Sequence, residues 1–492
     1  MAGVKSLMKD TAVYGVSSIL GRFLNWCLVP VYTYYFTTAQ YGVVTNLYAY
    51  VALLLILLTY GMETGFFRFT NHERWKNPTE VYTTTLISIG TTSLIFMGLV
   101  CGFSSDIARW VDCGDSPSFI TMMAIAVGLD AFTSIPFAYL RYKRRPIRFA
   151  TLKFLNIAVN IVLNIFFIVI CPWLAEHWPG SVSWFYNPEF GVGYIFLANL
   201  ISSALMLVLL LPELRVAYSF NGKLLRQMLG YSFPLLVLGV AGIMNQTIDK
   251  ILYPFLIPDT QEATRQLGIY GACYKIAIVM VMFIQAFRFA YEPFIFAKNK
   301  EKGDDQKATY AMAMKFFVIF ALFIFLGVMF YLDIIKYFIS PRYFEGLKVV
   351  PIIMMAELFF GIFFNLSLWY KLTDKTIWGT WFSLGGLAVT LALNITLVPK
   401  FGYIACAWAA FACYGSMMLA SYFIGQKKFP IRYPLGRMAI YLMVAMGLYG
   451  LSIVADTGSE ILNYCFRALL LCGYVMLVMK LEHPLAALRK KA

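Results

Sequence analysis

The sequence is poor in charge. Only 13% of its 492 residues are Asp, Glu, Lys or Arg, and 60% are hydrophobic, whereas a soluble domain has roughly 25% charged and roughly 45–50% apolar residues. A soluble fold of this length could not bury so much apolar surface, so lipid must be its solvent. The composition therefore predicts a polytopic membrane protein.

Motifs of metal and nucleophile chemistry are also absent. The three histidines, His72, His177 and His483, fall in expected loops or tails. No HExxH, Walker A or GxSxG pattern occurs. The nine cysteines are scattered without a CxxC pair, as is typical of small apolar side chains. We therefore expect no catalytic residue, no metal site and no cofactor.

What the sequence does contain is long apolar runs. A hydrocarbon core of about 30 Å takes roughly 20 helical residues. Runs of this length predict an all-α integral membrane fold with about 14 transmembrane helices. The predicted spans are 12–36, 42–68, 81–104, 118–140, 149–172, 191–212, 230–257, 268–297, 308–331, 347–370, 376–398, 402–424, 435–454 and 460–480.

The basic residues between the spans predict the orientation. With the N-terminus in the cytoplasm, 28 of the 40 lysines and arginines fall in or beside cytoplasmic segments, and six fall in external segments. The loop from Arg141 to Arg148 is the most basic. Cytoplasmic loops of membrane proteins carry such an excess. We therefore expect both termini in the cytoplasm, and we attribute the net charge of +15 to topology rather than to nucleic-acid binding.

A weak internal repeat predicts the domain organisation. Span 2 opens at Gly42 and span 8 opens at Gly268, each within a similar short motif. Many transporters are built from repeated bundles, so we expect two six-helix lobes followed by two further helices. The predicted segments are an N-lobe over 1–229, a C-lobe over 230–424 and a C-terminal helix pair over 425–492.

Cations inside the spans are functional candidates, because a buried charge costs at least about 2.5–3.5 kcal/mol. Arg22 lies mid-span with no acidic neighbour within a turn of its own helix, so it is the leading candidate for a cation that faces an aqueous lumen. Lys250, Lys275 and Arg288 are further candidates for substrate binding. Arg288 has a structural interpretation as well, because Glu292 follows it at i+4.

The acidic residues of the spans are candidates for coupling to H⁺ or Na⁺. Such coupling needs carboxylates within the membrane. The candidates are Asp130, Asp249, Glu292 and Glu357. For Arg68, Lys315 and Arg467 we consider snorkelling, in which a long side chain reaches the membrane interface.

Asparagines form a polar stripe. Asn156, Asn160 and Asn164 recur every four residues in one span and therefore share a helix face. Asn245 precedes Asp249 by the same spacing. Amides in spans often hydrogen-bond neighbouring helices, and they can equally line a polar lumen that contacts substrate. Both interpretations stay open.

Four features together resemble the oligosaccharide flippases, or polysaccharide biosynthesis proteins, of the multidrug/oligosaccharidyl-lipid/polysaccharide (MOP) exporter superfamily. The first is a basic N-terminus followed by a span with Arg22 and Pro30. The second is the run from Gln285 to Phe294, and the third is the turn from Lys400 to Tyr403. The fourth is the count of fourteen helices.

The resemblance implies two bundles around a central cavity that opens alternately to each side of a bacterial inner membrane. It also implies a lipid-linked oligosaccharide as substrate, usually carried on undecaprenyl pyrophosphate, with membrane lipid and polysaccharide polymerase machinery as expected partners. A diphosphate needs cations that stay charged in a lumen, which favours Arg. Sugars need hydrogen-bonding groups and aromatic faces, and the chain has 32 Tyr and 10 Trp.

Two other functions remain as alternatives. A drug or cation exporter of the same superfamily would have a lumen dominated by acidic and aromatic side chains, whereas this chain offers Arg22, Lys250, Lys275 and Arg288. A membrane-embedded glycan polymerase or glycosyltransferase would need large external loops. The longest external loop here, 173–190, has few polar groups for chemistry.

Overall fold

The computed structural model describes residues 19–71, 77–111, 116–298, 304–373, 375–455 and 458–482, without the side chains of 290, 292–298 and 304–306. These residues form helices and no strand. Thirteen helical stretches among them are long and apolar enough to cross a membrane. The prediction of an all-α integral membrane fold is therefore confirmed.

The thirteen stretches correspond in order to the second through fourteenth predicted spans. The first predicted span, 12–36, begins outside the described residues, and its described part is helical over 19–26 and again from Val29. The stretches are Thr38–Thr70, Pro78–Gly102, Pro117–Tyr142, Pro146–His177, Gly193–Leu214, Gly222–Leu256, Thr260–Phe289, Lys307–Phe330, Pro341–Leu372, Ile377–Phe401, Tyr403–Lys428, Leu435–Val454 and Glu460–Glu482.

The chain forms two compact units. The first unit comprises Met1–Ala272 and Ser383–Ala409, and the second comprises Cys273–Phe382 and Ala410–Ala492. The chain passes between them within three helices, α13 (Thr260–Lys298), α18 (Ile377–Phe401) and α19 (Tyr403–Lys428). These units do not test which helices move together during transport, so the N-lobe, C-lobe and C-terminal pair stay a prediction.

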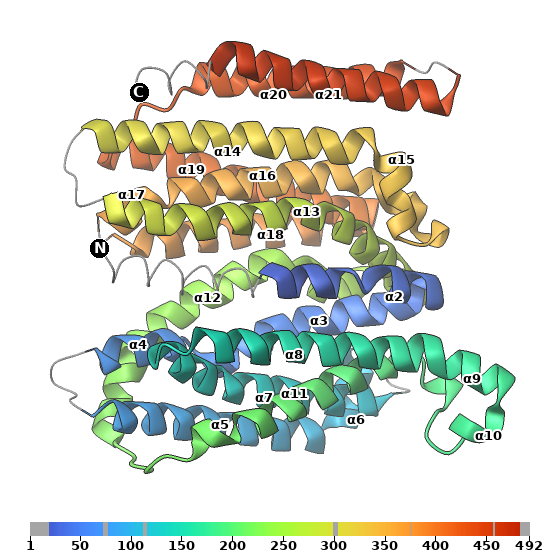
Figure 1. Cartoon of the computed structure of the whole chain (residues 1–492), viewed down its shortest axis with the longest axis vertical. Coiled ribbons are helices and arrows are strands. Elements are labelled where there is room, and N and C mark those ends of the chain that lie inside the picture. The colour runs from blue at the N-terminus through green and yellow to red at the C-terminus, as the bar shows by residue number, and fades with distance from the viewer. Residues whose placement is uncertain are drawn as a thin grey trace. The chain divides into compact units, whose positions relative to one another are not determined.

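The first unit consists of helices that run alongside one another (Figure 1). Besides the parts of α13, α18 and α19 that it shares, its elements are α2 (Val29–Tyr35), α3 (Thr38–Thr59), α4 (Met62–Thr70), α5 (Pro78–Gly102), α6 (Ser104–Trp110), α7 (Pro117–Tyr142), α8 (Pro146–Ile165), the π-helical turn η1 (Phe166–Ile170), α9 (Cys171–His177), α10 (Pro179–Val182), η2 (Pro188–Phe190), α11 (Gly193–Leu214) and α12 (Gly222–Leu256).

The second unit contains the C-terminal helices. Its α14 packs against α16, α20 and α21. Besides the shared helices, its elements are α14 (Asp304–Phe330), α15 (Leu332–Ile335), η3 (Lys336–Phe338), η4 (Pro341–Val349), α16 (Val350–Leu366), α17 (Leu368–Leu372), α20 (Leu435–Val454) and α21 (Glu460–Glu482).

Local sequence signals set several helix starts. Thr37 and Gln40 form a capping box at α3, in which each side chain bonds the other's backbone N–H. Asn221 caps α12 by accepting from the N–H groups of residues 223 and 224. Pro146 stands at the first position of α8, where its missing N–H costs no hydrogen bond.

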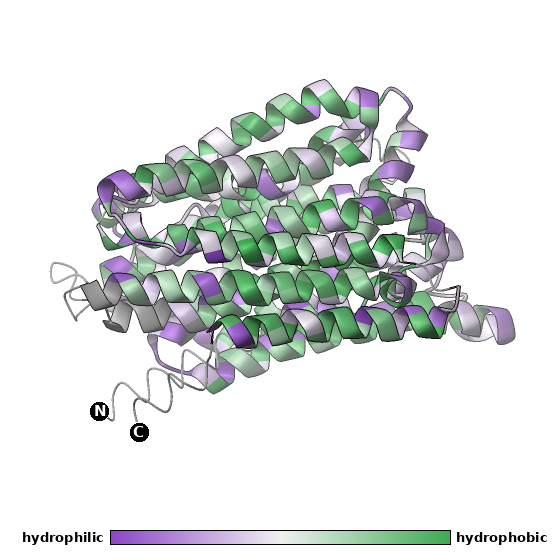
Figure 2. Cartoon of the chain, turned by 90° about the horizontal axis from the view of Figure 1, so that it is seen from above, coloured by the Kyte–Doolittle hydropathy of each residue, from purple (hydrophilic) through white to green (hydrophobic). Residues whose placement is uncertain are grey.

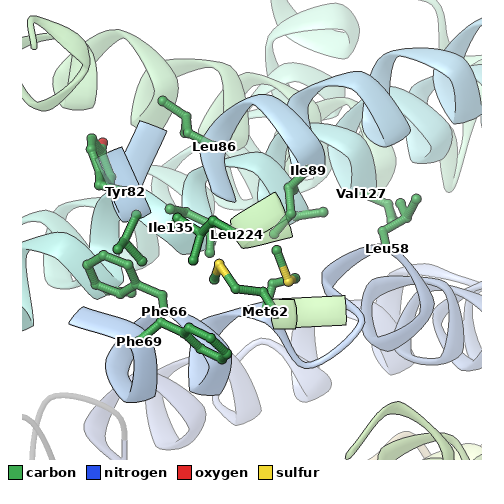
Figure 3. Packing of buried hydrophobic residues seen from close by; sticks show 14 residues of the cluster. Leu58, Met62, Phe66, Phe69, Tyr82, Leu86, Ile89, Val127, Ile135 and Leu224 are labelled. Carbon is green, nitrogen blue, oxygen red and sulfur yellow. The ribbon is translucent and has the colours of Figure 1, made fainter. Parts of the chain in front are cut away.

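One apolar core of the first unit joins five helices (Figure 3). Met62 and Phe66 of α4 are fully buried there, together with Leu224 of α12. Side chains this well enclosed specify one packing arrangement, because interiors tolerate few voids. The labelled members are Leu58, Met62, Phe66, Phe69, Tyr82, Leu86, Ile89, Val127, Ile135 and Leu224.

Two glycines bring α3 and the start of α13 into backbone contact within the first unit. A Cβ on Gly42 would lie 1.9 Å from the Thr264 carbonyl oxygen, and a Cβ on Gly268 would lie 1.9 Å from the Thr38 carbonyl oxygen. Only glycine fits at either position, as in other close contacts of membrane helices. The two glycines that open spans 2 and 8 therefore pack on each other's helices.

The outer surface suits lipid. Figure 2 shows hydrophobic residues along the helices and hydrophilic residues gathered toward helix ends and connections. The C-terminal helices expose large apolar side chains, with Val454 at 83%, Ile461 at 74% and Leu469 at 69% of their surface. In water these would be unfavourable, whereas hydrocarbon solvates them, so the pattern is that of a membrane-spanning bundle.

Candidate functional site

A chain of hydrogen bonds links four helices inside the first unit. The Tyr32 hydroxyl of α2 donates to Asn164 Oδ1 (3.0 Å). Asn164 Nδ2 donates to Asn160 Oδ1 (3.1 Å), and Asn160 Nδ2 donates to Asn199 Oδ1 of α11 (2.8 Å). Asn199 Nδ2 donates to the Tyr48 hydroxyl of α3. We call these five residues the amide chain.

The amide chain uses two of the three predicted asparagines of α8. Asn164 is fully buried and Asn160 is half-buried. Asn156, one turn earlier, makes no side-chain hydrogen bond to the described residues, although it shares their helix face. The π-helical turn η1 begins two residues after Asn164, and such turns often occur at functional sites.

Asp130 of α7 lies beside the same bundle. Ser203 Oγ of α11 donates to its carboxylate at 2.7 Å, and Ser203 follows Asn199 of the amide chain by one helical turn. Lys153 of α8 attracts the carboxylate electrostatically. Asp130 is nevertheless exposed. An acidic side chain held by neighbouring helices within a span is a candidate to bind or release a cation.

Asp249 and Lys250 of α12 pair with each other. Lys250 Nζ lies 3.1 Å from Asp249 Oδ1 and donates to the main-chain oxygen of Gln246 at 2.9 Å. The Tyr270 hydroxyl of α13 donates to Asp249 Oδ2 at 2.8 Å. Because the two charges compensate one another, the pair is a neutral, buried unit rather than an isolated cation and an isolated anion.

Two further hydrogen bonds tie α12 to its neighbours in the first unit. Asn46 Nδ2 of α3 donates to the main-chain oxygen of Lys250 at 2.8 Å. Asn245 Nδ2 donates to the main-chain oxygen of Ser383 in α18 at 3.0 Å. Asn245 therefore bonds between helices, which is one of the two roles that its spacing allows.

Glu357 of α16 is the buried acid of the second unit, with 4% of its surface exposed. The Tyr274 hydroxyl of α13 donates to its Oε1 at 2.8 Å. Lys275, a predicted lumen cation, is the next residue along α13 and is half-buried. A carboxylate enclosed in this way needs either a proton or a cation to stay in a membrane interior.

Two cations of the second unit converge on one aromatic ring. The guanidinium carbon of Arg288 in α13 lies 4.4 Å from the centre of the Phe364 ring, and the Lys371 ammonium of α17 lies 4.5 Å from the same centre. Cation–π contacts of this length stabilise each positive group, while the two like charges repel. Two positive groups held this close to one ring are suited to bind an anion.

The structure leaves two predicted residues outside these clusters. Arg22 is exposed, and its helix lies along α8, because a Cβ on the adjacent Gly21 would meet Ile157 at 2.6 Å. The side chain of Glu292 lies outside the described residues, so the interpretation of Arg288 and Glu292 as a pair stays a prediction.

The remaining charges in the spans find partners in the protein. The Arg68 guanidinium lies 4.0 Å from the centre of the Tyr231 ring. Lys315 pairs with Glu482, which also accepts from the Tyr441 hydroxyl. Arg467 pairs with Asp333 at 2.7 Å. Within the described part of the chain, no group of three His, Cys, Asp or Glu side chains lies close enough to hold a metal ion.

The sequence reasoning missed several members of these clusters. Tyr32 and Tyr48 are aromatic residues among many, and nothing local marks which tyrosine hydroxyl will meet an amide. Asn199 and Ser203 are spaced i, i+4 within one span, and that spacing is the signal that could have identified them. Lys371 lies just past a predicted span, where basic residues are expected from the positive-inside pattern alone.

The fold is that of known transporters. It is similar to "Lipid II flippase MurJ, inward closed conformation", with a TM-score of 0.72 and 13% identity. The match covers 96% of this chain and 98% of that one. It is also similar to the inward-facing conformation of a multidrug resistance MATE family transporter of the MOP superfamily, with a TM-score of 0.65, 12% identity and coverage of 83% and 94%. These identities are low, so the likeness shows the fold.

The sequence itself supplies the family. Comparison with curated proteins gave no match. The pattern of the family described as polysaccharide biosynthesis protein matches residues 7–297, more than half of the chain. The resemblance to polysaccharide biosynthesis proteins is thereby confirmed, and the chain belongs to that family.

Proposed function

We propose that this protein moves a lipid-linked oligosaccharide across a bacterial inner membrane by alternating access. The observation that carries the proposal is that two kinds of polar groups lie at different places inside a membrane-spanning fold. Amides and hydroxyls join across one unit, and cations meet at an aromatic ring in the other. The similar structure is that of a lipid II flippase, which supports a lipid-linked cargo.

Each kind of polar group has a part in this proposal. The amide chain offers donors and acceptors on rigid helices, which suits the hydroxyl groups of a sugar. Arg288 and Lys371 would bind the diphosphate of an undecaprenyl carrier, because guanidinium and ammonium groups bond phosphate oxygens strongly. Arg22, Lys250 and Lys275 are the further cations proposed for the lumen. The polyprenyl tail would stay in the surrounding hydrocarbon.

We further propose that transport is driven by H⁺ or Na⁺. Asp130 is the leading coupling residue, because it is exposed and yet held by Ser203. Asp249, Glu292 and Glu357 are the other candidates. Protonation or Na⁺ binding would remove the net charge of the carboxylate and so lower the cost of closing the bundle around it.

The orientation is part of the same proposal. The excess of lysine and arginine favours cytoplasmic termini. Cysteine substitutions at two exposed positions, Lys143→Cys and Trp184→Cys, test it in a variant that lacks the native cysteines. An impermeant maleimide added to whole cells should label the second and spare the first. The reverse pattern would overturn the orientation without affecting the family assignment.

The decisive experiment is reconstituted transport. Purified protein in vesicles with a lipid-linked oligosaccharide in one leaflet should move it to the other, as measured by access of an impermeant lectin. Arg22→Ala and Arg288→Ala should abolish movement while protein levels stay unchanged. Arg288→Lys should retain part of the activity, because it keeps the charge and loses the bidentate geometry. Normal transport by both alanine variants would refute the cationic lumen.

The same vesicles separate the alternatives. The fold also suits a drug exporter, since multidrug transporters share it. Efflux of lipophilic cations, without movement of the lipid-linked sugar, would favour that function. We propose that the substrate is moved without chemical change, so mass spectrometry should recover it intact. Recovery of a lengthened or transferred glycan would instead indicate a polymerase or glycosyltransferase.

A further inference from the structure

A basic hollow lies at the start of α8, away from the amide chain. It has a volume of about 500 Å³ and is lined by Arg144, Arg145 and Arg148, with Ile147, Thr151 and Leu152. Asn160 is twelve residues further along the same helix than Arg148, which corresponds to about 18 Å at the rise of an α-helix. We call this feature the α8 hollow.

A buried acid lies within ion-pair distance of two of the arginines. Glu213 at the end of α11 is 5% exposed. Its Oε2 lies 3.1 Å from Arg148 Nη2, and its Oε1 lies 3.9 Å from Arg145 Nη1. Tyr82 fixes the backbone at this point by donating to the Glu213 main-chain oxygen at 3.0 Å. Because each guanidinium has five N–H donors, most donors of both arginines remain available to another acceptor.

The hollow retains excess positive charge. Arg144 is exposed, and no described carboxylate lies within ion-pair distance of it. Its backbone adopts φ +51°, a left-handed conformation that is unusual for a residue with a side chain and often marks a functional turn. The hollow therefore has three arginines and one carboxylate, which lies near two of them, and the remaining positive charge favours an anion.

An apolar side chain stands between the cations. Ile147 exposes 78% of its surface and lies between Arg145 and Arg148 at the start of a span. In water such exposure is unfavourable. At a membrane interface the isoleucine contacts acyl chains while the arginines meet phosphates, so this combination fits a lipid headgroup better than a soluble anion.

We propose that the α8 hollow binds the phosphate of an anionic phospholipid in the leaflet at the start of α8. The phosphate would accept from Arg144 and Arg148, and Ile147 would lie against the upper acyl chain. This lipid would anchor α8, the helix that carries Asn160 and Asn164, and it would be distinct from the transported cargo.

The test measures lipid binding, so its outcome is independent of transport. Full-length protein is placed in nanodiscs of phosphatidylcholine with or without phosphatidylglycerol, and retained phosphatidylglycerol is counted by native mass spectrometry. A hydrogen bond from a guanidinium to a phosphate contributes at least about tenfold in affinity. The variant with both Arg144→Gln and Arg148→Gln should therefore bind at least about tenfold more weakly, and Ile147→Ser should weaken binding about threefold.

Lys143→Gln is the matched control, because it removes one charge from the same loop. The Lys143 ammonium lies over the Tyr139 ring, 5.2 Å from its centre, and outside the hollow. It should retain binding within about twofold. Equal losses in Lys143→Gln and Arg144→Gln would mean diffuse attraction and would overturn the site. Inorganic phosphate that displaces the lipid at millimolar concentration would show a free-phosphate site and would overturn the lipid assignment.

Discussion

The two compact units stabilise polar side chains among their helices by different means. In the first unit, neutral groups form the amide chain from Tyr32 to Tyr48, and the charges of Asp249 and Lys250 cancel within a few ångströms. In the second unit, the charged groups of Arg288 and Lys371 lie 4.4 Å and 4.5 Å from the centre of the Phe364 ring. The amide chain is neutral and the Asp249–Lys250 pair is compensated, whereas two cations meet at the Phe364 ring.

This contrast separates the two tasks of binding an amphiphilic, anionic cargo. Neutral amides satisfy one another in the empty protein and can exchange partners with sugar hydroxyls at small cost, because one hydrogen bond replaces another. Two cations beside one ring attract an anion more strongly than a single cation does, so this cluster suits a charged ligand. We therefore expect variants of Lys371 to affect charge recognition, variants of the amide chain to affect stability, and variants of Asp130 to affect coupling.

The largest effect is expected at the shared ring of the second unit. Lys371→Gln should lower the initial transport rate of a diphosphate-linked sugar at least tenfold, because a charge-assisted hydrogen bond is worth about 1.5–3 kcal/mol. The rate is measured in the reconstituted vesicles. Lys375→Gln, four residues later and exposed, is the control and should change the rate less than about twofold. Equal rates for the two variants would remove the basis for an anion site at Phe364.

The second prediction compares Asp130 and Glu357, each of which accepts a hydrogen bond from a neighbouring hydroxyl group. Asp130→Asn keeps the hydrogen bond from Ser203 and removes the charge, so it should abolish the stimulation of transport by a H⁺ or Na⁺ gradient. Glu357→Gln in the second unit should alter stimulation less, because Glu357 is 4% exposed. If Asp130→Asn still responded to the gradient and Glu357→Gln did not, the coupling residue would be Glu357 in the second unit.

The smallest effect concerns the amide chain. Asn164→Leu removes the link between Tyr32 and Asn160 and leaves the half-buried tyrosine without that acceptor, so it should destabilise the protein by about 1 kcal/mol. Thermal unfolding in detergent measures the change. Asn156→Leu, on the same stripe but outside the chain, should be near neutral. Similar losses for both variants would indicate that the stripe acts through general polarity rather than through these bonds.

Sequence reasoning succeeded wherever the signal was local. The apolar runs located thirteen spans that the structure contains, because a helix in lipid satisfies its own backbone and needs only length and hydropathy. The stripe of Asn160 and Asn164 correctly predicted a shared face. Gly42 and Gly268 were noticed as the openings of two similar spans, but their mutual backbone contact depends on how the helices pack.

The candidate site was less accessible to sequence reasoning. Asp249 and Lys250 were both expected to act as charged groups, and their adjacency did not indicate that Tyr270 and Gln246 would complete a neutral pair around them. Lys371 follows a predicted span directly, and at such a position the positive-inside pattern is a sufficient explanation for a basic residue. Its approach to Phe364 and Arg288 depends on packing between α13, α16 and α17.

The sequence by itself determined that this chain is a membrane protein of many helices, where those helices lie, and which few residues carry charge or amides within them. These properties follow from composition and from the fixed repeat of an α-helix. Only the tertiary structure decided the partners: which tyrosines complete the amide chain, which charges cancel, and which cations meet at one ring. The hydrogen-bonded partners lie more than a hundred positions apart in the sequence, and no local sequence pattern indicates such a pairing.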